Sequence, residues 1–185
     1  MKFVKVLFGN KSYAGNKVTE FKINDITVAD PLENPDGFHF SNEENIARWL
    51  IRGDTIYDVI IPDNANVIKV SNSSTPDGVY TTDKIVLTNP RTITDEIAFR
   101  LYQKSNFPEN TYFKTIAGYA VRGHVNAAKH IIKDKINAHN IDLCLSEFQG
   151  SCPPNVPQGS HESWNEILNI LNDIKQKSLY KHMPL

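Results

Sequence analysis

The chain has 185 residues, of which 40% are hydrophobic, and this is enough to bury a core in one domain or in one domain with an appendage. Its formal net charge of −1 provides no general basic field for nucleic acid and no polybasic patch for an anionic membrane, so any such partner would have to bind a local surface. No apolar run approaches the ~18 residues of a membrane span. We therefore expect a soluble, cytoplasmic protein, or a virion-associated one if its origin is viral.

The N-terminal residues and the cysteines agree with that expectation. Met1–Gly9 alternates lysine with apolar residues and lacks the unbroken apolar stretch of a signal peptide, so it predicts a first strand. Cys144 and Cys152 are too few for a disulfide framework, and no histidine pair lies beside them to complete a zinc site. We expect two reduced thiols, with a bridge across the intervening loop as the alternative.

Residues 1–90 predict a strand-rich half. After the first strand, residues 10–16 are typical of a polar loop and residues 18–23 of a second strand. Two segments rich in β-branched residues, 55–61 and 67–70, predict further strands. A late strand follows at residues 84–87, and Pro90 is expected to end it.

One helix is expected within this half, at residues 42–52. The pair Ser41 and Glu44 has the spacing of a capping box, in which each side chain accepts from the other residue's backbone N–H. Behind it, an apolar stripe falls on one helical face, and Gly53 is placed to end the helix in the left-handed conformation.

A helical half is expected at residues 91–149, because the spacing at which apolar residues recur changes there from two residues to 3.6 residues. Thr94 is expected to cap the first helix, and Pro108 to open the second. The small residues at positions 117, 118, 120, 127 and 128 would let two helices approach closely as an antiparallel hairpin.

The remaining residues predict a linker or long loop at 150–160 and an amphipathic helix with a frayed tail at 161–185. The linker contains prolines and glycines with almost nothing to bury. The helix carries an apolar stripe that must be covered by its own chain or by a partner. Its members are Trp164, Ile167, Leu168, Leu171 and Ile174.

Residues with chemical potential are scattered along the chain. His39 lies between two phenylalanines on an expected strand and could donate to a ligand, although a structural histidine is the simpler interpretation. His124 and His130 point to different helical faces, so we assign no metal. There is no nucleophile elbow, phosphate loop or dinucleotide fingerprint. The acidic residues are expected to be solvated or capping carboxylates.

The first half resembles the ADP-ribosyltransferase fold. The resemblance lies in a strand ending Leu7-Phe8-Gly9, a segment Gly37-Phe38-His39-Phe40-Ser41 with a helix behind it, and the later strands 57–61 and 84–87. In that family the glycine–aromatic–serine segment and its helix pack beneath the nicotinamide of NAD, and a glutamate beside a late strand polarises the ribose. The resemblance therefore implies that Gly37, His39 and Ser41 contact the cofactor. Asp83 then stands at the catalytic position.

The middle of the chain is similar to an uncharacterised domain found in large DNA viruses, phages and some bacteria, often joined to pentapeptide repeats. The similarity lies in the runs Arg52-Gly53-Asp54-Thr55, Thr111-Tyr112-Phe113-Lys114, Ala120-Val121-Arg122-Gly123 and Ile141-Asp142-Leu143. It implies an accessory or interaction role.

The sequence as a whole predicts an α+β protein: a small mixed or antiparallel sheet with one packed helix, followed by an all-helical half. Two functions remain open. The favoured one is a non-catalytic protein-binding or accessory module without a cofactor, which contacts another protein, or a second copy, through the helical half and the Trp164 helix. The alternative is an ADP-ribosyltransferase-like enzyme that uses NAD.

Overall fold

The computed structural model describes residues 2–14, 17–70, 78–151 and 158–180. The chain divides into two compact units. The strand-rich unit comprises Met1–Ile93 with Lys104–Asn106, and the helical unit comprises Thr94–Gln103 with Phe107–Leu185. The α+β class expected from the sequence is confirmed.

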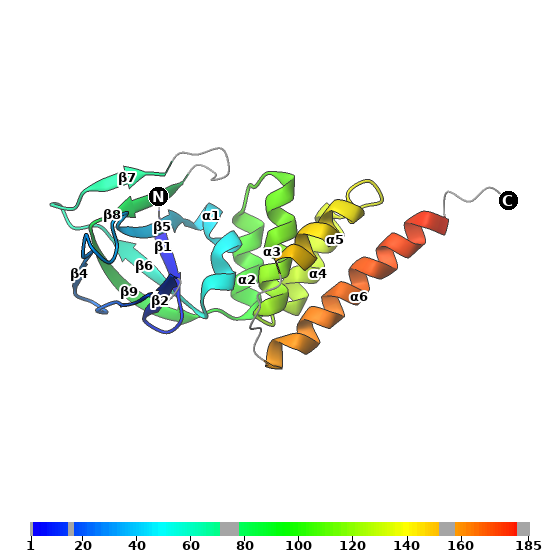
Figure 1. Ribbon diagram of the computed structural model, residues 1–185, viewed down its shortest axis with the longest axis horizontal. Helices are drawn as coiled ribbons and strands as arrows, with labels where there is room; N and C mark the ends of the chain where they lie inside the picture. Colours follow the sequence, from blue (N-terminus) through cyan, green and yellow to red (C-terminus); the bar gives the residue numbers. More distant parts are fainter. Residues whose placement is uncertain (1, 15–16, 71–77, 152–157, 181–185) are drawn as a thin grey trace. The chain divides into compact units, whose positions relative to one another are not determined.

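The strand-rich unit is built on a seven-stranded sheet in the order β4-β9-β6-β1-β5-β8-β7 (Figure 1). Every neighbouring pair of strands is antiparallel. The strands are β1 (Phe3–Leu7), β4 (Ile26–Val28), β5 (Phe38–Asn42), β6 (Thr55–Ile60), β7 (Val67–Lys69), β8 (Val79–Thr82) and β9 (Lys84–Thr92). A separate hairpin pairs β2 (Lys11–Ala14) with β3 (Lys17–Glu20). Strand β2 lies where a loop was expected, and β3 overlaps the strand expected at residues 18–23.

The sheet forks between its two central strands, β1 and β5. The paired residues of β1 and β5 are only Phe3 with Asn42 and Val4 with Ser41, whereas β1 stays paired with β6 as far as Leu7. On its other side β5 remains paired with β8. From Lys5 onward, therefore, the backbones of β1 and β5 separate.

The two faces of the sheet are covered differently. One face carries the main apolar core, in which successive strands contribute every second residue. This cluster consists of Leu7, Phe21, Phe38, Phe40, Tyr57, Val59, Ile85 and Leu87. On the opposite face lies a short helical segment, α1 (Glu43–Ile46) followed by the 3₁₀ helix η1 (Ala47–Arg52), which contacts β1 and β5. Leu50 is completely buried there.

The capping box predicted at Ser41 and Glu44 is not formed. Ser41 belongs to β5, and its Oγ donates to the carbonyl of Asn42 at 3.2 Å. Asn42 holds the N-cap position, but its side-chain oxygen accepts from Asn45 Nδ2 and from no backbone N–H of the helix. After one α-helical turn the segment tightens into η1.

The left-handed cap predicted at Gly53 is also wrong. Gly53 has a φ of 176°, which is extended backbone. Position 53 requires glycine because there is no room for a side chain: a Cβ here would lie 2.2 Å from the carbonyl oxygen of Leu7.

Pro90 does not end the late strand, because β9 continues to Thr92. The sheet accommodates the proline at an irregularity: Asn89 has a positive φ of 51°, and the β6–β9 register shifts between Ile56 and Asp58. A bulge of this kind removes the need for a ladder N–H from proline.

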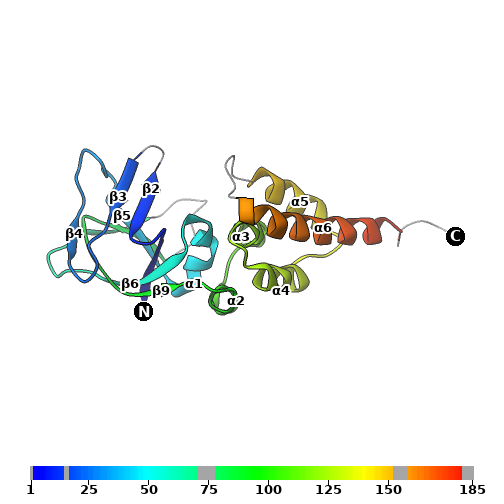
Figure 2. The ribbon, with the colours of Figure 1, turned by 90° about the horizontal axis from the view of Figure 1, so that it is seen from below.

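The helical unit is arranged around one buried helix, α3 (Glu109–Val121) (Figure 2). Helices α4 (Val125–Lys135), α5 (Ile141–Gly150) and α6 (Gln158–Tyr180) pack against it. The small residues Ala117 and Ala120 on α3 and Ala127 on α4 are completely buried, in agreement with the predicted close approach. The unit also contains α2 (Asp95–Lys104) up to Gln103, and Thr94 Oγ1 accepts from the Ile97 N–H as the cap expected there.

Within this unit three members of the α6 stripe, Trp164, Ile167 and Leu171, are buried, and the other two are half-buried. The ring of Trp164 stacks on that of Phe148 in α5, with centroids 3.9 Å apart, and Ile167 and Leu171 are completely buried. Two ion pairs flank the stripe, Lys129–Glu166 at 2.5 Å and Lys175–Asp142 at 2.8 Å. The helix therefore uses its stripe to complete its own unit.

Candidate anion-binding site

Three of the four site residues expected from the sequence lie on or beside β5. Gly37 precedes the strand with a φ of +73°, and a Cβ there would lie 2.5 Å from the Thr82 carbonyl oxygen. His39 and Ser41 project from the same face, because side chains alternate along a strand. His39 is exposed, whereas Ser41 is buried beneath the helical segment, with 1% of its surface exposed. A ligand on this face would meet His39 and not Ser41.

The fourth, Asp83, lies in the turn between β8 and β9. Its Oδ1 accepts from the backbone N–H of Asn66 at 2.7 Å, and its own N–H donates to the Asn66 carbonyl. Its backbone carbonyl accepts from the Ala29 N–H. Asp83 thus holds together two loops of the strand-rich unit.

Lys5 lies at the fork of the sheet. It sits on the core face of β1 between Phe3 and Leu7, and only 8% of its surface is exposed. Its Nζ donates to the backbone carbonyl of His39 at 2.5 Å and lies 5.2 Å from the ring centroid of Phe21. The amine therefore bonds a β5 carbonyl at the place where the β1 and β5 backbones have separated.

The charge on Lys5 is held in an unfavourable environment. Burial, and then the nearby charge of Arg52, lower the pKa of Lys5 from 10.5 to about 8. Within the described part of the chain, no carboxylate forms an ion pair with it. An ammonium ion has three donors, and the His39 carbonyl accepts from one of them.

The helical segment adds two arginines on either side of Trp49 in sequence. The guanidinium carbons of Arg48 and Arg52 lie 4.6 and 5.1 Å from the centroid of the Trp49 ring. Because a 3₁₀ helix has three residues per turn, Trp49 and Arg52 fall on the same side of η1. Cation–π contacts hold both arginine side chains in place without neutralising their charge.

Arg48 carries a buried donor without a partner. Its Nη1 is inaccessible to solvent and makes no hydrogen bond with any described residue. Burial, and then the charge of Arg52, lower the pKa of the Arg48 guanidinium. Leaving such a donor unsatisfied is costly, so an acceptor at this place would stabilise the protein.

The four basic side chains Lys5, His39, Arg48 and Arg52 form what we call the basic cluster. Although the His39 side chain is exposed, partial desolvation of its imidazole lowers its pKa, the charges of Lys5 and Arg52 lower it further, and Asp36 opposes the shift. Arg52 affects each of the other three members, whereas Arg48 is coupled to Arg52 alone. The charge of Arg52 therefore acts on the pKa of each of the other three members. The arrangement favours an anion.

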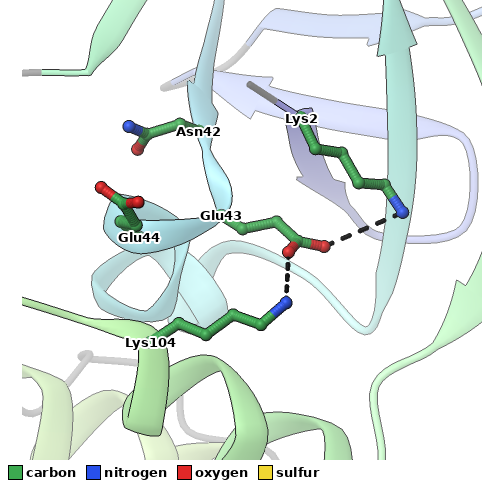
Figure 3. Close-up of a pocket in the computed structure, with 5 residues that line it drawn as sticks. All are labelled: Lys2, Asn42, Glu43, Glu44 and Lys104. Carbon is green, nitrogen blue, oxygen red and sulfur yellow. Dashed lines mark hydrogen bonds and ion pairs between the residues drawn. The ribbon is translucent and has the colours of Figure 1, made fainter.

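A second feature of the strand-rich unit is a hollow of about 330 Å³, lined by Lys2, Asn42, Glu43, Glu44 and Lys104 (Figure 3). Its central carboxylate, Glu43, lies 3.8 Å from Lys2 Nζ and 2.5 Å from Lys104 Nζ. Lys2 also pairs with Asp58 at 3.1 Å. Because the cations there already have carboxylate partners, the hollow has no excess of positive charge to attract an anion.

Three further features bear on metals, thiols and membranes. Among the residues described, no group of histidine, cysteine, aspartate and glutamate side chains is placed to hold a metal ion. Burial raises the pKa of the Cys144 thiol to about 12, and Cys152 lies outside the described residues. None of the helices that the structure describes combines the length and the hydropathy needed to cross a bilayer.

Sequence reasoning selected His39 but missed the other three members of the basic cluster. A signal for Lys5 was present, since it occupies an inward position of the alternating strand between Phe3 and Leu7. The signal for the two arginines was weaker, because Arg48 and Trp49 followed by an arginine three residues after Trp49 are ordinary on a solvated helix.

No protein-family model, curated protein or solved structure matches the chain.

Proposed function

We propose that this protein is a non-catalytic binding module whose strand-rich unit binds a small phosphate-bearing anion at the basic cluster. The observation that carries the proposal is the buried, unpartnered Nη1 of Arg48 beside a second arginine. Guanidinium groups bind phosphate oxygens through paired hydrogen bonds, and such charge-assisted bonds are the strong ones. A phosphate oxygen would supply the missing acceptor and offset the repulsion among the cluster's cations.

The state of the other expected site residues supports binding without catalysis. The hydroxyl of Ser41 is buried and bonded within β5, and the carboxylate of Asp83 caps a loop. Neither is available to activate a nucleophile or to polarise a substrate hydroxyl without giving up a structural role.

Calorimetric titration of the full chain with ATP at low ionic strength tests the proposal. We expect binding that weakens as salt is added, because exposed charges are screened. Arg52→Met should weaken binding at least about tenfold, which corresponds to about 1.4 kcal/mol. Arg100→Met, which removes an exposed arginine of α2, is the matched control and should bind as the parent does. Absence of heat at millimolar ATP, or equal losses in both variants, would contradict the proposal.

A second candidate, the NAD-linked ADP-ribosyltransferase, is favoured by one observation. Segment Gly37–Ser41 forms a strand that leads directly into a helix, as the resemblance implies, and His39 belongs to the basic cluster. Under this reading NAD is the anion and Asp83 the catalytic carboxylate. Titration with NAD separates the candidates: binding abolished by His39→Ala, together with release of nicotinamide, would establish the enzyme, and binding without turnover would leave the module.

A protein partner remains part of the proposal, but the strand-rich unit suits it better than the Trp164 helix does. The stripe of that helix is buried, and the large apolar side chains exposed in the described part of the helical unit are Leu143 and Leu179. In the strand-rich unit, Ile26 and Ile60 are both exposed and both pair with Val86, so they form a row across three strands. Such a row is a more suitable contact for an apolar partner segment.

A further inference from the structure

We infer that the β2–β3 hairpin is a self-association surface, through which two copies of this chain pair about a twofold axis into a weak dimer. The inference is independent of the proposed function, because it concerns neither the basic cluster nor its ligand. The two strands lie side by side as a sheet of their own (Figure 2). Their cross-strand pairs are Lys11 with Glu20, Ser12 with Thr19, Tyr13 with Val18 and Ala14 with Lys17.

The polar face of the hairpin is turned toward its own unit. Side chains alternate between the two faces of a hairpin, and the two members of a cross-strand pair share a face. Thr19 Oγ1 donates to Asn34 Oδ1 at 3.3 Å. From the same face, Lys17 Nζ donates to the carbonyls of Leu32 and Glu33 at 3.4 and 3.3 Å. The hairpin therefore meets its own unit with a hydroxyl and an amine.

The apolar face of the hairpin is turned outward. Tyr13 and Val18 lie side by side on it, with 51% of the tyrosine and 52% of the valine exposed. The rings of Phe8 and Tyr13 meet edge to face with centroids 5.7 Å apart, and this contact limits the positions that the tyrosine can take. A two-stranded hairpin is marginally stable alone and ordinarily needs its apolar face to be packed. The inverted orientation of this hairpin therefore indicates that a partner covers its outer face.

The charges on the outer face identify that partner as a second copy of the chain. Lys11 and Glu20 form the next pair along this face, with Nζ and Oε2 3.8 Å apart and the side chains 43% and 65% exposed. The face thus presents one cation on β2 and one anion on β3, so it is complementary in charge to itself.

One symmetry operation satisfies both pairs of the outer face. Two sheets pack face to face with their strands nearly aligned. A twofold axis that runs along the strands, midway between β2 and β3, places β2 of each copy opposite β3 of the other. Lys11 then faces Glu20 of the second copy, Tyr13 faces Val18 of the second copy, and each contact forms twice.

The small size of this face makes the dimer weak. Counting Phe8, it presents five residues, far fewer than the roughly 20–30 a side of a stable interface. The Lys11–Glu20 pair within one copy is loose and exposed, so exchanging it for pairs between copies costs little. We expect association only at high protein concentration.

Sedimentation velocity of the full chain, at low ionic strength and up to about 1 mM, tests the inference by charge exchange. Lys11→Glu and Glu20→Lys each place like charges opposite one another across the twofold axis, so each should weaken dimerisation at least about tenfold. An equimolar mixture of the two variants restores opposite charges at both contacts. With a fluorescent label on one of them, the mixture should show a heterodimer about as tight as the parent dimer.

Two further variants complete the test. Lys133→Glu, at an exposed lysine of α4, changes the net charge as Lys11→Glu does and should dimerise as the parent does. Tyr13→Ser removes the exposed ring and should also weaken the dimer at least about tenfold.

The outcomes are separate from those for the anion site, which titration with ATP decides. A parent that stays monomeric at about 1 mM would overturn the self-association, and so would a mixture that associates no more than either variant alone. Dimerisation unchanged by Tyr13→Ser would exclude this face. Mixing also separates the interface from folding, because a variant weakened by misfolding is not rescued by the other.

Discussion

Replacing Lys5 by methionine should stabilise the strand-rich unit at neutral pH and remove a pH dependence of its stability. The ordinary pKa of lysine, 10.5, applies to the unfolded chain, and burial lowers the pKa of Lys5 to about 8 in the folded protein. Each pKa unit corresponds to about 1.36 kcal/mol, so the folded unit holds the charged amine at a cost of about 3 kcal/mol below pH 8.

The sign of the pH dependence follows from where the proton is bound. Between about pH 8 and pH 10.5 the unfolded chain keeps the Lys5 proton and the folded chain loses it. The free energy of unfolding therefore rises with pH in this window, by up to about 1.4 kcal/mol per pH unit. Methionine has no proton to lose, so its contribution does not change with pH. It forfeits the bond to the His39 carbonyl, which costs about 1–2 kcal/mol at every pH.

The two effects predict a crossover. At about pH 7 the variant should be more stable by about 1–2 kcal/mol, and at about pH 10.5 it should be less stable by about the same amount. Urea unfolding followed by tryptophan fluorescence measures this, in a Trp164→Phe background that leaves Trp49 as the reporter of the strand-rich unit. A variant that is less stable than the parent by the same amount at every pH would refute the reasoning, because it would show that Lys5 is neutral or well solvated in the folded protein.

Three further substitutions test the fold, each by urea unfolding. Gly53→Ala should destabilise the strand-rich unit by about 3 kcal/mol or more, because the new Cβ meets a β1 carbonyl, whereas Gly150→Ala, with open space around it, should cost less than about 0.5 kcal/mol. Asp95→Ala should destabilise the helical unit by about 1 kcal/mol, because the Asp95 carboxylate accepts from an N–H in the first turn of α4, whose own N-cap makes no side-chain bond. Ile167→Ala should cost about 2–5 kcal/mol without changing the mass seen by light scattering, and the exposed Leu143→Ala less than about 0.5 kcal/mol; loss of a dimer in the first variant would show that α6 is an interface.

Local signals predicted the elements where local physics decides them. The change of apolar period near residue 90, the Thr94 cap and the stripe of α6 depend on neighbours within a turn or two, and the structure contains all three. Gly53 was misassigned because its requirement comes from the backbone of β1, far away in the sequence. Pro90 was misassigned because the bulge that accommodates it depends on the register of β6. Long-range pairing of this kind leaves no periodic trace in the sequence.

The candidate site was harder to predict than the fold for the same reason. His39 was selected on its own β5 segment, but its partners come from β1 and η1, and the fork that brings Lys5 to the His39 carbonyl is a property of strand pairing. Ser41 met the sequence pattern of a capping residue and of a cofactor contact, yet its burial beneath the helical segment is compatible with neither. The residue type at position 41 is visible in the sequence, whereas the burial of its side chain is not.

The energetic balance of the basic cluster is the strongest reason to regard it as functional. A fold selected for stability alone would place methionine or leucine at Lys5, where the flanking strand residues are apolar, and would give the buried nitrogen of Arg48 an acceptor. The chain instead keeps a buried lysine on β1 and, on η1, an arginine whose buried nitrogen has no hydrogen-bond partner among the described residues, and the charge of Arg52 lowers the pKa of both groups. An anion bound at the Arg48 guanidinium would supply the missing acceptor, so part of the cost of the unpartnered nitrogen would be recovered when the ligand binds.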